Sequence, residues 1–167
     1  MTTPYLPGDP DNLAPYQTIW PPPIQGLAKA YFTPRMAPVP VATRLPQPGR
    51  TEDTINGFLR IEAAGGRVLK DELFFDCSVI LHSYANNNQE SMAEINAMRA
   101  VAHGGNAQGR AIVHPSLGKP WFVSWSRVTA LAVKQADPLV NMVRFRAMVT
   151  WRIQGTVDPL TPPDPVD

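Results

Sequence analysis

Residues 141–154 alternate apolar and polar side chains almost without interruption. The apolar set is Val143, Phe145, Ala147, Val149, Trp151 and Ile153. The other side carries Arg144, Arg146, Thr150, Arg152 and Gln154, with Met142 and Met148 as its only apolar members. A period of two without Pro or Gly predicts a β-strand with one buried and one wet face. Because strands are usually about five or six residues long, we expect this one to lie at the centre of a twisted sheet or to reach beyond the subunit.

The wet face of this predicted strand carries three arginines and no acid. Charged side chains of this kind usually lie on a solvent-exposed face. The alternative is a surface directed at a partner molecule or at nucleic acid. The residues alone leave both interpretations open.

The chain is long enough for one domain with a modest core, but it is poor in charge. Of its 167 residues, 17% are charged and 44% are hydrophobic. Charge this sparse favours a subunit whose surface is covered in an assembly. The net charge of +1 gives no global electrostatic case for binding nucleic acid or a membrane. Without a membrane-spanning apolar run or a signal-peptide pattern, the default compartment is the reduced cytoplasm.

Nineteen prolines divide the chain into three parts. They concentrate between Pro4 and Pro48 and again between Pro159 and Pro165. Proline-rich segments lack backbone donors and prefer extended conformations, so they do not form a core by themselves. We predict a Pro-rich N-terminal arm (residues 1–48) with a short helix at about residues 24–33, an α+β core (residues 49–155) and a Pro-rich C-terminal tail (residues 156–167).

Periodicity elsewhere predicts further strands and a second helix. Strands are expected near Val39 and Val41 as a sheet edge, and at about residues 55–62, 73–85, 111–115 and 121–134. The 73–85 strand should be covered at least in part on both faces, because its second face is half apolar. The last strand should form a hairpin with residues 141–154. These elements predict an α+β fold with a largely antiparallel twisted sheet, two helices packed on one face and a long C-terminal hairpin.

Prolines, asparagines and glycines predict where the helices and turns end. The first helix should end before Pro34, and the second should run from an Asn cap at residues 86–88 to about His103. Its inward side chains are expected to be Met92, Ile95 and Met98 or Arg99, helped by Ala93, Ala97, Ala100 and Val101. Gly104 and Gly105 should form a left-handed cap. Gly65 and Gly66 should form a turn.

No group of residues has the spacing of an active site. The candidates for chemistry are His82, His103, His114, Asp71, Glu72 and Asp76. The histidines lack metal-like spacing with the single cysteine or with paired carboxylates, so we expect structural or surface roles for them. The acids indicate a solvated turn at a strand start. Cys77 lies in an apolar run and is expected in the core. We therefore expect no enzymatic activity, cofactor or metal.

The order of the predicted elements matches a recognisable pattern. A strand with a Gly-Gly turn (residues 58–66) precedes a long strand (residues 74–84), an Ala-rich helix and a closing hairpin. In order, length and composition, residues 24–155 resemble the tail terminator proteins of long-tailed (siphovirus-type) phages, especially those that infect actinobacteria. The most similar stretches are residues 127–129, 137–140 and 144–151.

The resemblance implies a structural protein that forms a ring, typically of six copies. Such a ring caps the tail tube, stops its polymerisation and offers a surface for joining the head. The implied partners are the tail-tube protein and the head–tail connector or stopper protein. The implied location is the virion, at the head–tail junction, after assembly in the host cytoplasm and without a membrane.

Within such a ring, five residues become candidates for the subunit interface or the lumen: Arg144, Arg146, Arg152, Trp121 and Trp125. The arginines would either face the lumen, near passing DNA, or pair with acids of the adjoining subunit. Attraction to phosphate supports the lumen. A strongly basic lumen would slow the exit of DNA, which favours the subunit interface.

Other functions remain open alongside the tail terminator. One is a different ring of the phage neck or tail, such as a head–tail stopper or the tail-tube subunit itself. A second is a ligand-binding or enzymatic α+β domain, which would need a pocket with convergent polar groups. A third is an unrelated oligomer of the cell.

Overall fold

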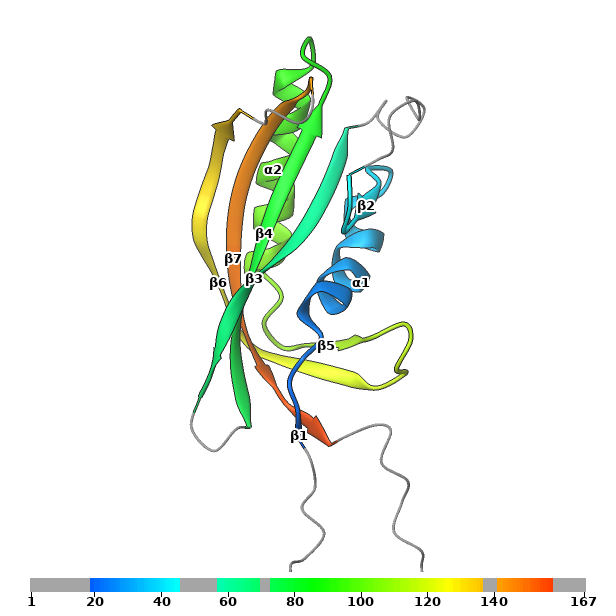
Figure 1. Ribbon diagram of the computed structural model, residues 1–167, viewed down its shortest axis with the longest axis vertical. Helices are drawn as coiled ribbons and strands as arrows, with labels where there is room; N and C mark the ends of the chain where they lie inside the picture. Colours follow the sequence, from blue (N-terminus) through cyan, green and yellow to red (C-terminus); the bar gives the residue numbers. More distant parts are fainter. Residues whose placement is uncertain (1–18, 46–56, 70–72, 137–140, 158–167) are drawn as a thin grey trace, which may run out of the picture.

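A computed structural model describes residues 19–45, 57–69, 73–136 and 141–157. Within them, the helices α1 (Ile24–Met36) and α2 (Glu90–Gly105) accompany a six-stranded sheet of order β2-β3-β4-β7-β6-β5. The strands are β2 (Val41–Ala42), β3 (Phe58–Val68), β4 (Phe74–Ala85), β5 (Arg110–Val113), β6 (Pro120–Gln135) and β7 (Val143–Gln154). Neighbouring strands are antiparallel except β2 and β3. The α+β class is confirmed, and the sheet is curled (Figure 1).

β7 lies at the centre of the sheet, between β4 and β6. Its side chains alternate between buried and half-buried from Val143 to Ile153. The predicted central strand with one buried face is therefore confirmed. β4 is covered on both faces along most of its length, as its half-apolar second face predicted.

Three aromatic rings join both helices to β7. Tyr31 and Phe32 of α1 lie with ring centroids 5.2 and 5.9 Å from that of Trp151. The indole N–H of Trp151 donates to the carbonyl oxygen of Gly104 in α2 at 2.8 Å. The Tyr31 hydroxyl donates to the carbonyl oxygen of His103 at 2.8 Å. We call Tyr31, Phe32 and Trp151 the aromatic cluster; it lies in the main hydrophobic core.

α1 continues past Pro34, so the prediction that it ends before this residue is wrong. A proline inside a helix removes one backbone hydrogen bond. Met36 is fully buried beyond the proline, and its burial stabilises the last turn. The Arg35 guanidinium also donates to the Tyr31 carbonyl oxygen at 2.8 Å. Tertiary packing therefore outweighs the local cost of the proline.

The inward face of α2 consists mostly of small residues: the predicted Ala93, Ala97, Ala100 and Val101 are buried, and the predicted Met92 packs partly buried against a core cluster. Its buried positions are Ala93, Asn96, Ala97, Ala100, Val101 and Gly104. Ile95 and Met98, which we predicted to face inward, are 62% and 61% exposed. The predicted Asn cap is also absent, because α2 follows Gln89 and has no side-chain cap.

Gly104 explains why α2 presents small residues to the sheet. A Cβ atom added there would lie 2.9 Å from Cγ1 of Val149 and 3.1 Å from Cζ of Phe32. The helix therefore lies too close to the sheet for a side chain at this position. The predicted left-handed cap is wrong, since Gly104 and Gly105 belong to α2 and neither has a positive φ.

The Gly65-Gly66 pair lies inside β3 and does not form the predicted turn. The pairing of β3 with β4 shifts in register between Ala63 and Gly66, as in a β-bulge. Gly65 has a φ of 84°, a conformation that favours glycine. A Cβ atom on Gly66 would lie 2.4 Å from the Asp76 carbonyl oxygen. The two glycines therefore allow one long strand to continue through an irregularity.

A separate two-stranded sheet joins segments from both ends of the chain. β1 (Ile19–Trp20) pairs antiparallel with β8 (Thr156–Val157), and Ile19 lies opposite Val157. This pair extends beyond the main sheet, at the end away from the start of α2 (Figure 1). Much of the predicted arms (residues 1–18, 46–48 and 158–167) lies outside the described residues, as do residues 49–56 of the predicted core. The helix assigned to the N-terminal arm packs into the core, and β2 forms the predicted sheet edge at Val41.

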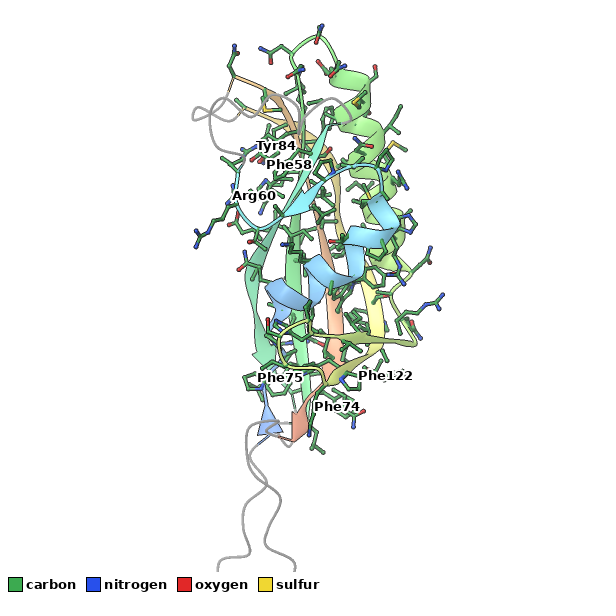
Figure 2. All side chains as sticks on the ribbon, turned by 90° about the vertical axis from the view of Figure 1, so that its right-hand side faces the viewer. Phe58, Arg60, Phe74, Phe75, Tyr84 and Phe122 are labelled. Atoms are coloured by element: carbon green, nitrogen blue, oxygen red, sulfur yellow. The ribbon has the colours of Figure 1, made fainter. Side chains whose placement is uncertain are left out.

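The two ends of the sheet differ in their aromatic residues (Figure 2). Phe58 and Tyr84 lie together near the start of α2, with ring centroids 6.3 Å apart, and both are buried. Phe122, near the opposite end, is 44% exposed. The end close to β1 and β8 therefore presents an aromatic ring to its surroundings.

Replacing the central aromatic residue tests this packing. We expect Trp151→Phe to lower the free energy of unfolding by about 2 kcal/mol, because it removes a buried hydrogen bond and leaves a cavity. Trp125→Phe, at a half-buried position, should cost less than about 1 kcal/mol. Urea denaturation followed by circular dichroism measures both values. Equal losses would contradict the central role of the aromatic cluster.

Candidate functional site

The three candidate arginines lie on the outer face, which we define as the sheet face that carries Asp76, His82 and Arg146. Arg144, Arg146 and Arg152 alternate with the buried positions of β7, and each is half-buried. In register, β4 places His82 opposite Arg146 and Asp76 opposite Arg152. The arginines therefore belong to a polar strip that two strands build together.

Asp76 is the acid that sequence analysis missed on this face. The Arg152 guanidinium binds the Asp76 carboxylate through Nε and Nη2, at 2.8 and 3.2 Å, and Arg67 binds it at 3.0 Å. The hydrogen bond from Arg152 is the main reason that the pKa of Asp76 is lowered, although burial acts in the opposite direction. The same bond raises the pKa of Arg152. The prediction of a solvated turn at Asp76 is wrong, and Arg152 pairs with an acid of its own chain.

The two candidate tryptophans of β6 have different environments. Trp125 is half-buried, and the guanidinium carbons of Arg152 and Arg127 lie 5.4 and 5.3 Å from its ring centroid. These distances are typical of cation–π contacts. Trp121 is 1% exposed and belongs to the hydrophobic core. Its selection as an interface or lumen residue is therefore wrong, because its side chain is not accessible to a partner.

Arg144 and Arg146 differ in what surrounds them. The Arg144 guanidinium donates to the Ala136 carbonyl oxygen at 2.9 Å, which fixes it at the end of β6. Arg146 makes no hydrogen bond or ion pair with the residues that the structure describes. Its neighbours across the sheet are His82 and Val133. Among the three arginines, Arg146 has the charge that is most available to a second molecule.

A buried histidine lies beside Arg146 on the outer face. Nε2 of His82 lies 3.0 Å from a Glu62 carboxylate oxygen, and Arg60 binds the same carboxylate at 2.8 Å. His82 is 4% exposed, and its Nδ1 atom makes no hydrogen bond to a described residue. Burial is the main cause that lowers the pKa of His82, while the hydrogen bond to Glu62 opposes it. The group has the character of a structural histidine, as predicted.

An apolar groove lies between α2 and β6. It has a volume of about 310 Å³ and is lined by Glu94, Met98, Val101, Ala102, Leu131 and Ala132. Leu131 and Val133 on β6 are 73% and 59% exposed. Leu131 and Met98 line this groove, which we call the α2–β6 groove, and Ile95 of α2 is also exposed. Contiguous apolar surface of this kind marks interaction sites.

Among the described residues, the sheet has a strand edge on each side that no other strand covers. No described strand pairs with the outer edge of β6 between residues 124 and 135, because β5 begins at Arg110, opposite Val123, and runs alongside β6 only as far as Pro120. On the other side, β2 covers β3 only at Leu59 and Arg60. Beyond the β2 contact, residues 63–68 of β3 are exposed. Such edges can pair with a strand of another chain.

The sequence pattern reveals the arginines but not this groove. The sequence pattern predicts Ile95 and Met98 to face inward because they follow Met92 at intervals of three residues. Leu131 and Val133 occur at alternate positions of β6, but the pairing of β6 with β7 shifts in register between Ala130 and Val133. Val133 therefore lies opposite Arg146 on the outer face, whereas Leu131 lines the groove beside α2. The alternation of residues in a sequence reveals neither such a register shift nor which strand lies at a sheet edge.

Other kinds of site are limited within the described part of the chain. There, no three His, Cys, Asp or Glu side chains gather as a metal site requires. No helix among the described residues is long and apolar enough to cross a membrane. Cys77 is buried, as predicted, and burial raises the pKa of its thiol to about 11. At neutral pH this thiol is almost entirely protonated, which makes it unreactive.

Comparison with known proteins assigns no family to the chain. No protein-family model matches the sequence, and no curated protein matches it.

The buried histidine predicts how stability depends on pH. Because the pKa of His82 is lowered from 6.5 in the fold, the unfolded chain binds its proton more readily. The free energy of unfolding should therefore fall as the pH drops below about 6.5. The pKa of His103 is lowered too, again chiefly by burial, and it contributes in the same direction.

Urea denaturation at pH 7.5 and 5.5 measures this effect. The native chain should be less stable at pH 5.5, and His82→Gln should reduce the difference between the two pH values. His103→Gln on the same background should reduce it further. A difference that is unchanged in both variants would show that these histidines do not set the pH dependence.

Proposed function

We propose that this chain is a structural subunit of a homo-oligomeric ring, and specifically a tail terminator of a long-tailed phage. The observation that carries the proposal is the pair of uncovered strand edges on opposite sides of one sheet. In this function the chain has no enzymatic activity. Its partners are further copies of itself, the tail-tube protein and the head–tail connector or stopper protein.

The two edges favour a head-to-tail arrangement of copies. The β6 edge carries Leu131 and Val133, whereas the exposed stretch of β3 carries Gly65, Gly66 and Arg67. Because the two edges differ, contact between the β6 edge of one copy and the β3 edge of the next is heterologous. Heterologous contacts generate either a closed ring or an open filament. A ring leaves no edge unpaired.

The α2–β6 groove supplies the apolar area that such an interface needs. Burying a fully exposed Leu or Met side chain contributes about 1.5–3 kcal/mol. Leu131, Met98 and Ile95 are each more than half exposed in the isolated chain. Their burial by a neighbouring copy would offset much of the entropy lost on association.

The resemblance to tail terminators selects the kind of ring. It implies six copies that cap the tail tube and join it to the head in the virion. In such a ring Arg146 is the arginine that can meet a neighbour's acid or DNA in the lumen, since Arg152 already pairs with Asp76. The tail-tube subunit is the main competing function, because a tube also needs two complementary edges.

A charge placed in the α2–β6 groove tests the self-association. Leu131→Asp should raise the dissociation constant between copies at least tenfold, because the aspartate would be buried without a partner. Val113→Asp, at another position that is 51% exposed, is the matched control and should leave association unchanged. Analytical ultracentrifugation measures both. A native chain that stays monomeric at millimolar concentration would contradict the groove as an interface.

Electron microscopy of phage particles made without this protein tests the specific function. A tail terminator predicts heads without tails, together with free tubes of irregular excess length. Complete absence of tubes would assign the chain to the tube or to an earlier assembly step. Normal tails attached to heads would exclude the tail terminator function.

A further inference from the structure

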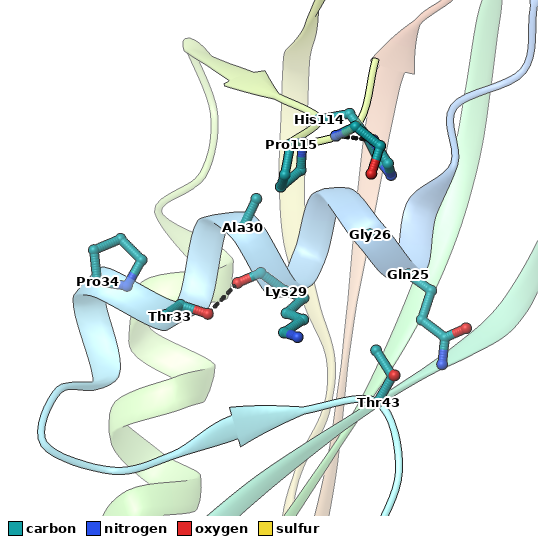
Figure 3. A pocket seen from close by; sticks show the side chains of 10 residues that line it. Gln25, Gly26, Lys29, Ala30, Thr33, Pro34, Thr43, His114 and Pro115 are labelled. Carbon is teal, nitrogen blue, oxygen red and sulfur yellow. Dashed lines mark hydrogen bonds between the residues drawn. The ribbon is translucent and has the colours of Figure 1, made fainter. Parts of the chain in front are cut away.

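A second groove, of about 680 Å³, runs along the exposed side of α1 (Figure 3). We call it the α1 groove. Two rows of α1 residues with helical spacing line it, and they include Gln25, Lys29 and Thr33. Thr43 borders it on one side, and the His114-Pro115-Ser116 segment borders it on the other. Its volume lies in the range of about 300–1,000 Å³ that is typical of ligand sites.

The far wall of the α1 groove is fixed against the helix. A Cβ atom added to Gly26 would lie 2.2 Å from Nε2 of His114, so only glycine lets the imidazole sit this close. The backbone N–H of Ser116 donates to Nδ1 of the same ring at 3.2 Å. The groove is therefore a defined feature of the fold rather than a chance gap between side chains.

The segments that border the α1 groove contain bases and no acid. Residues 19–45 carry Lys29, Arg35 and Arg44 without any Asp or Glu. Residues 110–120 carry Arg110 and Lys119, again without an acid. In a chain of nearly zero net charge this separation favours an anionic occupant. The exposed Lys29 ammonium and the hydroxyls of Thr43 and Ser116 offer donors to carboxylate and carbonyl oxygens.

Residues 158–167 have the complementary composition. They contain Asp158, Asp164 and Asp167, four prolines and no basic residue. A proline-rich segment favours the polyproline II conformation, which rises about 3.1 Å per residue. Residues 25–34 of α1 span about 14 Å at 1.5 Å per residue, so about five residues of such a segment match the groove. Its free carbonyl oxygens need donors of the kind that the groove presents.

The direction of the chain indicates which copy receives this segment. β1 leads into α1 through three prolines, Pro21, Pro22 and Pro23. β8 is antiparallel to β1, so the chain leaves β8 in the direction away from its own α1. Ten residues can then extend about 31 Å beyond Val157. This geometry favours the α1 groove of a second copy over that of the same copy.

We propose that residues 158–167 of one copy dock in the α1 groove of a neighbouring copy. This inference rests on the proposed self-association of the chain. Residues 1–18 are the rival occupant, because they are also proline-rich and contain Asp9 and Asp11. Their acid content is lower, with two acids in eighteen residues against three in ten, and so the C-terminal segment is the better match.

Disulfide trapping between full-length copies tests the proposal. A Thr33→Cys protein and a Val166→Cys protein are mixed and oxidised mildly, and covalent heterodimers are measured on non-reducing gels. The native Cys77 is buried with a raised pKa, so it does not compete. Asn88→Cys, at an exposed site before α2, replaces Thr33→Cys in the matched control. We expect at least fivefold more heterodimer with Thr33→Cys.

Charge variants test whether Lys29 attracts the acidic C-terminal segment. Lys29→Glu in the Thr33→Cys protein should reduce trapping several-fold, whereas Lys29→Arg should preserve it. Equal trapping by Thr33→Cys and Asn88→Cys would overturn the proposal. So would a bond formed only within a chain that carries both Thr33→Cys and Val166→Cys, or preferential trapping of a Thr3→Cys protein. Sedimentation of the same samples reports self-association separately, so oligomers without specific trapping would overturn only this inference, whereas monomers would remove the proposed ring.

Discussion

The close approach of α2 to the sheet is the constraint on which the rest of the structure depends. Gly104 lies against Val149 and Phe32 with no room for a Cβ atom, and its carbonyl oxygen accepts the indole N–H of Trp151. A helix held this near has no room for a side chain at Gly104, and alanines occupy most of its other inward positions. The larger apolar residues, Ile95 and Met98, therefore point outward. The apolar surface proposed for assembly follows from tight packing elsewhere in the same helix.

The sequence predicts the sheet better than it predicts the helices or the candidate site. The alternation in β7 is visible because one strand face is apolar and the other polar. For α2, the three-residue spacing of Met92, Ile95 and Met98 favours an inward stripe, but helix-to-sheet distance decides burial and depends on residues far apart in the chain. Asp76 and Arg152 are separated by 76 positions, so their pairing arises only from the β4–β7 register. The sequence also does not show which face of β6 enters the core, and so it does not reveal that Trp121 is buried.

The outer face shows how a basic strand is made compatible with a folded chain of low charge. One acid, Asp76, receives two guanidinium groups, while a backbone carbonyl binds Arg144. Trp125 provides an aromatic face to Arg152 and Arg127. Of the three candidate arginines of β7, only Arg146 makes no ion pair or hydrogen bond with the described residues. The three arginines are therefore not equivalent, although the sequence pattern presents them as a set.

The pairing of β1 with β8 also has a mechanical consequence. Ile19 lies opposite Val157, so the segments that precede and follow the described fold leave it from a single point. Tension applied through those segments acts across the two-stranded pair in a peeling direction, in which its few hydrogen bonds break one after another. The long strands of the main sheet carry no load until the short pair has separated. Under force applied through the ends of the chain, the β1–β8 pair is thus the first contact to separate, and the core is loaded only afterwards.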